Sequence, residues 1–321
     1  MNKVTQWLRY AIYGITGALV VFFVSHHYAD FKMVFSQFQG KWIFLVIPLQ
    51  ILMLVLAGYA FQCLSQAYQF PLRWQDWMGL SFIANFMNQL LPYRPGIFFR
   101  YFYLKKHYAM PLKCFAWVMS IYLCFTVLAA IVFLGIGWWF GDFQFERIYD
   151  LFLFLGLFVF FFTASWLFRK PLMAIAQDKK KIIHRTIDFY YTQLTPLLNS
   201  PMVLLRLVIT FALSYGLISL SLYLCFISIQ YPISLAHCLF LSGMLSLISL
   251  APVTAGNLGV NESVLGALTQ LMYHDFSIGF SAALIYRVAQ WIPGIILGSS
   301  FSFYLIGKAY PPPNSNKVLQ E

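Results

Sequence analysis

Leu90-Leu-Pro92-Tyr-Arg94-Pro-Gly96 breaks a long apolar stretch of the chain, 77–106, near its middle. A similar segment, Leu250-Ala-Pro252-Val-Thr-Ala-Gly256, breaks a second apolar stretch, 237–273. Proline removes a helical hydrogen-bond donor, and glycine tolerates backbone angles that other residues avoid. The shared Pro-x-x-x-Gly spacing therefore predicts two helices that are each broken into two halves.

The rest of the chain is also apolar and carries little charge. Of its 321 residues 61% are hydrophobic and 10% are charged, whereas soluble domains contain about 25% charged residues. A helix of roughly 20 apolar residues crosses a bilayer, and its backbone must bond to itself there. We expect an all-α polytopic membrane protein with two re-entrant hairpins at the broken stretches and about six full spans, near 7–25, 42–66, 114–140, 149–168, 202–229 and 276–308.

The ends and the charges of the chain exclude other classes of protein. The apolar run from Trp7 to Ser25 is too long for a signal-peptide core and lacks a small-residue cleavage site, so we expect a retained span. The net charge of +11 comes mainly from short connections between apolar runs, where basic residues set topology and contact anionic lipid headgroups. We therefore expect membrane lipids with anionic headgroups as partners, and no nucleic acid.

The distribution of basic residues favours hairpins that return to the side they entered. In that arrangement both termini and the basic groups within 94–113 and 169–185 are cytoplasmic. If 77–93 crossed fully, both groups would be exported, against the positive-inside tendency. We predict a multi-pass protein of the cytoplasmic (inner) cell membrane with cytoplasmic N- and C-termini.

The order of the predicted elements repeats along the chain. Residues 7–140 hold two spans, a broken hairpin and a third span, and residues 149–308 repeat that order. Three crossings per unit invert the second unit, as in many transporters. We predict one integral membrane domain, 1–321. The basic connection 169–201 is either an interfacial helix on an anionic leaflet or a loop that only sets topology.

Two charged residues lie within apolar segments. Glu262 lies in the second broken stretch, and Arg287 lies in the last predicted span. An ionised side chain near the bilayer centre costs about 2.5–3.5 kcal/mol, so such a residue needs a partner or a task. We predict that Glu262 pairs with Arg287, either as a purely architectural ion pair or as one that opens to admit an anion.

The first broken stretch carries groups that suit phosphate. A helix starting near Gly96 would present free backbone N–H groups and a positive dipole end. Asn88 precedes the break, and Arg94 and Arg100 add guanidinium groups that bind phosphate in a bidentate manner. These features favour a phospholipid-like headgroup. The alternative is that both arginines only fix orientation at the cytoplasmic edge.

Residues for catalysis are not apparent. The six histidines are scattered without a metal-binding spacing, and there is no P-loop. We expect a protein that is not an enzyme and needs no cofactor or metal.

The two broken stretches and Arg287 resemble motifs of a known family. The run Asn88-Gln-Leu-Leu-Pro92-Tyr-Arg94-Pro-Gly96-Ile-Phe-Phe-Arg100 resembles the N-x-x-L-P-x-R-x-G-E-x-x-R signature of the flippase-like family, also called the lysylphosphatidylglycerol synthase transmembrane region family. The segment 252–262 resembles its P-x-x-x-G-x-x-G-x-x-E element, and Arg287 matches its arginine in the last span. The chain departs from the family pattern at Tyr93, Ile97 and Asn261, where glycine, glutamate and arginine are usual.

The resemblance implies a function in moving lipids between leaflets, including aminoacylated phospholipids and isoprenoid-linked glycans. Members that modify lipid carry a soluble synthase domain after the membrane part, so we expect transport without synthesis here. The two hairpins would meet near the midplane and bind the headgroup through Asn88, Arg94, Gly96, Arg100, Gly256, Gly259, Glu262 and Arg287. The alternative is a non-transporting subunit that recruits or stabilises a lipid- or glycan-modifying enzyme through Lys179–Lys181.

Overall fold

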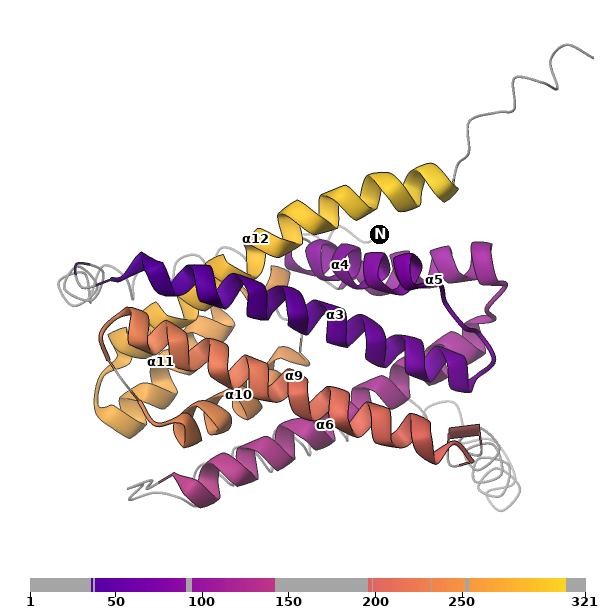
Figure 1. Ribbon diagram of the computed structural model, residues 1–321. Coiled ribbons are helices and arrows are strands. Elements are labelled where there is room, and N and C mark those ends of the chain that lie inside the picture. The colour runs from indigo at the N-terminus through magenta and orange to yellow at the C-terminus, as the bar shows by residue number, and fades with distance from the viewer. Residues whose placement is uncertain are drawn as a thin grey trace, which may run out of the picture. The chain divides into compact units, whose positions relative to one another are not determined.

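The structure is a computed structural model that describes residues 36, 38–90, 94–141, 196–197, 199–231, 233–251 and 254–309 (Figure 1). The chain divides into two compact units, one of Met1–Asp142 with Ser200–Glu321 and one of Phe143–Asn199. Nearly all described residues belong to the first unit. The predicted spans 7–25 and 149–168 lie outside the described residues, as does the connection 169–201 apart from a few residues at its end.

Every regular element in these ranges is a helix, which confirms the all-α class. The elements in chain order are η1 (Gly40–Trp42), α3 (Ile43–Ala67), α4 (Trp74–Leu90), α5 (Pro95–Tyr108), α6 (Leu112–Phe140), α9 (Pro201–Ser228), α10 (Leu235–Ser249), η3 (Ala255–Asn257), α11 (Val260–Tyr273) and α12 (Phe276–Ala309).

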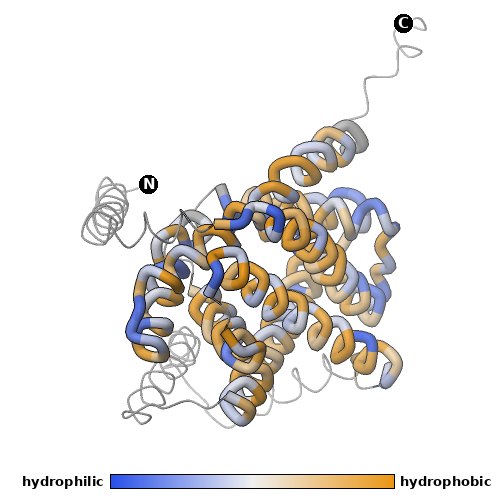
Figure 2. Tube along the Cα trace, turned by 60° about the vertical axis from the view of Figure 1, so that its left-hand side comes forward, coloured by the Kyte–Doolittle hydropathy of each residue, from blue (hydrophilic) through white to orange (hydrophobic). Residues whose placement is uncertain are grey.

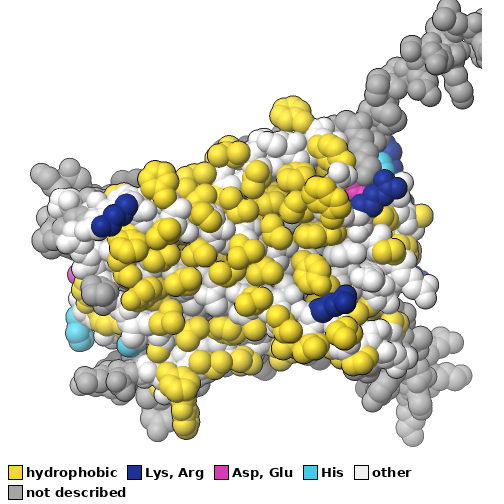
Figure 3. Space-filling view, viewed as in Figure 1, with side chains coloured by type: hydrophobic (Ala, Val, Ile, Leu, Met, Phe, Trp, Pro, Cys, Tyr) yellow, Lys and Arg dark blue, Asp and Glu magenta, His cyan; other side chains and the backbone are white. Residues whose placement is uncertain are grey.

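Four of the described helices, α3, α6, α9 and α12, are long and apolar enough to cross a membrane. Their ends agree within two residues with the spans predicted at 42–66, 114–140, 202–229 and 276–308. Hydrophobic residues predominate in the helices of the described chain (Figure 2). Large apolar side chains such as Leu205 and Val208 on α9 are exposed, and similar side chains cover most of the face shown in Figure 3. An apolar solvent suits such a surface, whereas water does not.

The two stretches predicted to be broken are each a pair of helices, as expected. The stretch 77–106 forms α4 and α5, and 237–273 forms α10 and α11. The backbone turns through the left-handed region at Arg94 (φ 52°) before α5, and at Gly256 (φ 55°) and Gly259 (φ 81°) before α11. We name α4–α5 the first hairpin and α10–α11 the second hairpin. Their re-entry into a membrane stays a prediction.

Polar and aromatic contacts close the base of each hairpin. In the first hairpin the hydroxyl groups of Tyr103 and Tyr108, near the end of α5, donate to the buried carboxylate of Asp76 at the start of α4. In the second hairpin the rings of His237 and Tyr273 have centroids 5.5 Å apart. In each hairpin, the start of the first helix therefore lies beside the end of the second helix.

The bases of the two hairpins lie at opposite ends of α6. This helix begins soon after the base of the first hairpin and spans about 43 Å at 1.5 Å per residue. Near its other end, a Cβ atom added to Gly137 would lie 2.3 Å from the Phe240 backbone nitrogen in the first turns of α10. Glycine thus permits the close packing of α6 and α10, and the two hairpins approach one another from opposite directions.

Candidate functional site

The tips of the two hairpins meet. A Cβ atom added to Gly256 would lie 3.1 Å from the carbonyl oxygen of Gln89, so the two backbones are nearly in contact. The guanidinium of Arg94, in the first tip, donates a hydrogen bond to the carbonyl oxygen of Ser249 at the end of α10. The predicted contact between the hairpins is therefore confirmed.

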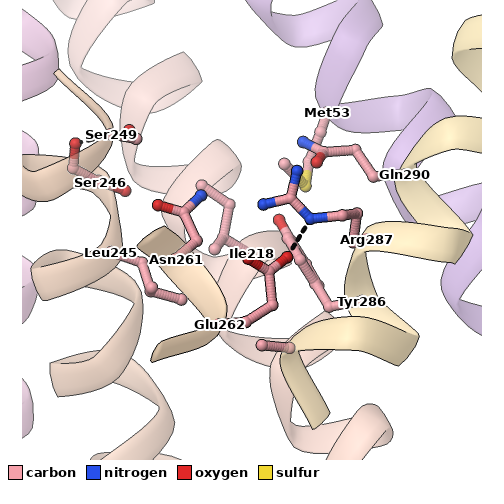
Figure 4. A pocket seen from close by; sticks show the side chains of 11 residues that line it. Met53, Ile218, Leu245, Ser246, Ser249, Asn261, Glu262, Tyr286, Arg287 and Gln290 are labelled. Atoms are coloured by element: carbon pink, nitrogen blue, oxygen red, sulfur yellow. Dashed lines mark hydrogen bonds and ion pairs between the residues drawn. The ribbon is translucent and has the colours of Figure 1, made fainter. Parts of the chain in front are cut away.

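Two adjoining cavities lie where the tips meet. One has a volume of about 170 Å³ and lies beside the start of α11 and the middle of α12 (Figure 4). The other has a volume of about 210 Å³ and lies between α4, the second tip and α12. Both are lined by Ser249, Asn261 and Gln290, so these residues form the boundary between the cavities.

Glu262 and Arg287 form a buried ion pair in the first of these cavities, as predicted (Figure 4). The side chains are 2% and 9% exposed. The Arg287 Nε group donates to Glu262 Oε1, and Glu262 Oε2 accepts a bond of 2.8 Å from the Gly259 amide at the start of α11. A carboxylate is favourable there because a helix N-terminus carries partial positive charge.

Two further donors of Arg287 bind the backbone of the second tip. Nη1 donates to the Gly256 carbonyl at 2.9 Å, and Nη2 donates to the Asn257 carbonyl at 3.1 Å. Three sides of the guanidinium are thus engaged within the second hairpin and α12. Arg287 holds the shape of the tip in this structure, and contact with a phosphate would require some of these bonds to open.

Arg94 has a different environment. It is partly buried, lines the larger cavity and donates to the Ser249 carbonyl. The only acidic residues in the described ranges are Asp76, Glu262 and Asp275, and Arg94 forms an ion pair with none of them. Its positive charge is therefore available to an anion that enters the cavity.

Carboxamide side chains supply most of the polar lining of the larger cavity. These are Asn85, Asn88, Gln89, Asn257, Asn261 and Gln290. Sequence reasoning did not single out Gln290 or Ser249. The position of Gln290, three residues after Arg287 on the same helix, places both on one face and was a usable signal. Nothing in the sequence pattern marked Ser249, whose carbonyl oxygen is the contact.

The other predicted site residues have different places. The Gly96 amide donates to Asn88 Oδ1 at 2.9 Å. Contrary to our expectation, this N–H group at the start of α5 is therefore not free to bind an anion. Arg100 lines neither cavity, and its guanidinium lies 4.6 Å from the centre of the Phe61 ring. The structure therefore brings together Asn88, Arg94, Gly256, Glu262 and Arg287, and it places Arg100 apart from them.

The groups at the tips suit hydrogen bonding and charge complementarity. Within the described ranges, His, Cys, Asp and Glu side chains form no group of three that could hold a metal ion. The site is thus a polar cavity with one available guanidinium, enclosed by broken helices of a membrane protein. Such joints between discontinuous helices are where membrane proteins place binding sites for polar ligands.

The fold and the site define a polytopic membrane protein whose two broken helical hairpins meet beside a buried ion pair. The chain matches the family described as "Lysylphosphatidylglycerol synthase TM region" over residues 6–298 and belongs to that family. It is therefore a multi-pass membrane protein of a family involved in lipid modification or transport. No curated protein and no solved structure matches the chain.

Proposed function

We propose that this protein moves a phosphate-bearing lipid between the two leaflets of the cytoplasmic membrane without modifying it. The observation that carries the proposal is Arg94, which lines a polar cavity at the joint of two hairpins and has no carboxylate partner among the described residues. A guanidinium kept in such a place favours an anionic ligand, and its planar donors match the geometry of phosphate. Family membership supports a lipid as the ligand.

The charges at the two hairpin bases support an orientation for this transport. Arg73, Lys105 and Lys106 lie at the base of the first hairpin, whereas the described residues at the base of the second hairpin include no lysine or arginine. Because basic residues favour the cytoplasmic side, the first hairpin enters from the cytoplasm and the second from the opposite face. Each leaflet then has its own broken hairpin leading to the shared cavities.

In this mechanism the headgroup alone crosses through protein. Its phosphate binds Arg94, while the acyl or isoprenoid tails stay in the surrounding lipid. The Glu262–Arg287 pair keeps the second tip closed when the cavity is empty. Opening the pair would release donors of Arg287 toward the phosphate, and closing it would return the headgroup to one leaflet or the other.

Leaflet exchange in liposomes tests the proposal. Purified protein is reconstituted with a headgroup-labelled anionic phospholipid, and the label in the inner leaflet is followed after the outer label is quenched. We expect exchange faster than in protein-free vesicles, and loss of that gain in Arg94→Gln. The matched control is Arg73→Gln, which removes an exposed arginine outside the cavities and should leave exchange unchanged.

Exchange at the protein-free rate, across anionic phospholipids and isoprenoid phosphates, would contradict transport. A subunit that recruits a modifying enzyme would then be the better account. That alternative depends on Lys179–Lys181, which lie outside the described residues.

A further inference from the structure

The larger cavity combines one cation with uncharged amides. Apart from Arg94, the charged side chains among the described residues that line it or the adjoining cavity are those of the Glu262–Arg287 pair, which neutralise one another. The carboxylate of Glu262 already accepts from Arg287 and from the Gly259 amide. A ligand therefore meets a net positive charge and no free carboxylate among the described residues.

Several polar groups of the lining lack a hydrogen-bond partner. Buried donors without a partner are Asn85 Nδ2 and Gln89 Nε2, one turn apart on α4, and a buried acceptor without a partner is Asn261 Oδ1. A buried polar group without a partner costs about 1–3 kcal/mol. These three atoms mark the part of the lining where polar groups of a ligand or water would satisfy the site.

The amide side chains of Asn85 and Gln89 pack against the backbone of α12. A Cβ atom added to Gly294 would lie 3.0 Å from Gln89 Oε1 and 3.7 Å from Asn85 Nδ2, so α12 presents bare backbone to both side chains. Each carboxamide offers both donors and an acceptor. A hydroxyl group also donates and accepts, so it is the natural complement of such a lining.

An ammonium group fits this lining poorly. It has donors only, whereas two of the three groups without partners are themselves donors. It would also be repelled by Arg94, and the described residues that line the cavity include no carboxylate. Like charges brought together in a low-dielectric site are strongly unfavourable.

The size of the cavity limits the headgroup. Its volume of about 210 Å³ is below the roughly 300–1,000 Å³ of pockets for drug-sized ligands. In this conformation it accommodates a small headgroup.

We propose that the larger cavity selects a small, uncharged, hydroxyl-bearing headgroup linked to its lipid by an anionic phosphate, and rejects aminoacylated headgroups. This inference rests on the proposed function, and it names the substrate class for it. A glycerol headgroup on a phospholipid and a single sugar on an isoprenoid phosphate share the required chemistry. An aminoacylated phospholipid, which adds ammonium groups, does not.

Competitive lipid retention tests the selectivity independently of transport. The protein is placed in phosphatidylcholine nanodiscs with equal amounts of phosphatidylglycerol, phosphatidic acid, lysyl-phosphatidylglycerol and an isoprenyl-phosphate monosaccharide, and retained lipids are measured by native mass spectrometry. We expect phosphatidylglycerol or the isoprenyl sugar, or both, to be retained about tenfold more than the lysyl lipid and than phosphatidic acid, as one lost hydrogen bond implies. The ratio of retained phosphatidylglycerol to retained isoprenyl sugar shows which of the two lipids the cavity prefers.

Variants separate the hydroxyl contacts from the phosphate contact. The double variant Asn85→Ala/Gln89→Ala should abolish the preference for phosphatidylglycerol over phosphatidic acid, whereas Arg94→Gln should weaken retention of both. The control Gln270→Ala removes an exposed amide of α11 outside the cavities and should change neither.

Retention of lysyl-phosphatidylglycerol equal to or above that of phosphatidylglycerol would overturn this inference, and it would leave transport standing if liposome exchange is fast. Selective retention without any leaflet exchange would instead contradict transport and support the headgroup selectivity. The two proposals therefore fail separately.

Discussion

At the scale of single residues, the buried pair of Glu262 and Arg287 is the feature most open to measurement. Removing either partner leaves an uncompensated charge, so Glu262→Gln and Arg287→Gln should each lower stability by about 3–5 kcal/mol. The double variant should lose less than the sum of the two single variants, because it leaves neither charge alone. Denaturation of purified protein in detergent, followed by circular dichroism, measures these differences.

Strict additivity of the two substitutions would show that the side chains do not interact. A loss of transport in the double variant with stability largely retained would assign the pair a role in function beyond architecture. Arg73→Gln, at an exposed position, again serves as the neutral control.

Residue contacts were predictable only where burial in lipid leaves few options. The high cost of an isolated charge was enough to pair Glu262 with Arg287 across the chain. Proximity along the chain to the break at Gly96 grouped Arg100 with Arg94 as phosphate ligands, but the rotation of α5 turns Arg100 toward the Phe61 ring. That rotation is set by packing, for example by Gly96, whose added Cβ would lie 2.3 Å from the Ala84 carbonyl oxygen. Such contacts follow from tertiary structure and not from spacing along the chain.

At the scale of elements, the contact between the hairpin tips depends on Gly256. Its φ of 55° is strained for any other residue, and an added Cβ would lie 3.1 Å from backbone of α4. Gly256→Ala should therefore push the tips apart, reduce lipid exchange severalfold and lower stability by about 1–2 kcal/mol. Exchange assays and detergent denaturation of the same preparation measure both effects.

The matched control is Gly135→Ala on α6, where an added Cβ meets no atom within 4 Å. This substitution should preserve exchange, and it should not reduce stability because alanine favours the helix. Equal behaviour of the two alanine variants would contradict a role for close contact between the tips.

The elements themselves were largely predictable. Apolar runs longer than a bilayer thickness place α3, α6, α9 and α12 within two residues, and the Pro-x-x-x-Gly segments place both breaks. What the pattern could not supply is the capping at each break. The Asn88 side chain accepts a hydrogen bond from the Gly96 amide at the start of α5. Spacing along the chain does not reveal that a side chain already binds this backbone N–H group.

At the scale of the whole molecule, the proposed orientation makes the hairpin bases face opposite compartments. In a variant without native cysteines, a cysteine at Lys105 should react with a membrane-impermeant maleimide only after the cells are opened. A cysteine at Asp275 should react in intact cells. If intact cells were labelled at Lys105 and not at Asp275, the orientation would be opposite to the proposed one. Labelling at both positions would contradict hairpins that enter from opposite faces.

The proposed transport depends on a site for a lipid phosphate that the two tips enclose beside Arg94. An experimental density map of the protein in a bilayer containing phosphatidylglycerol tests it most directly. We predict ordered headgroup density in the larger cavity, with phosphate oxygens within about 3 Å of the Arg94 guanidinium and the tips in contact. Separated tips, with Arg94 turned to bulk water and lipid density confined to the outer faces of the helices, would contradict the claim.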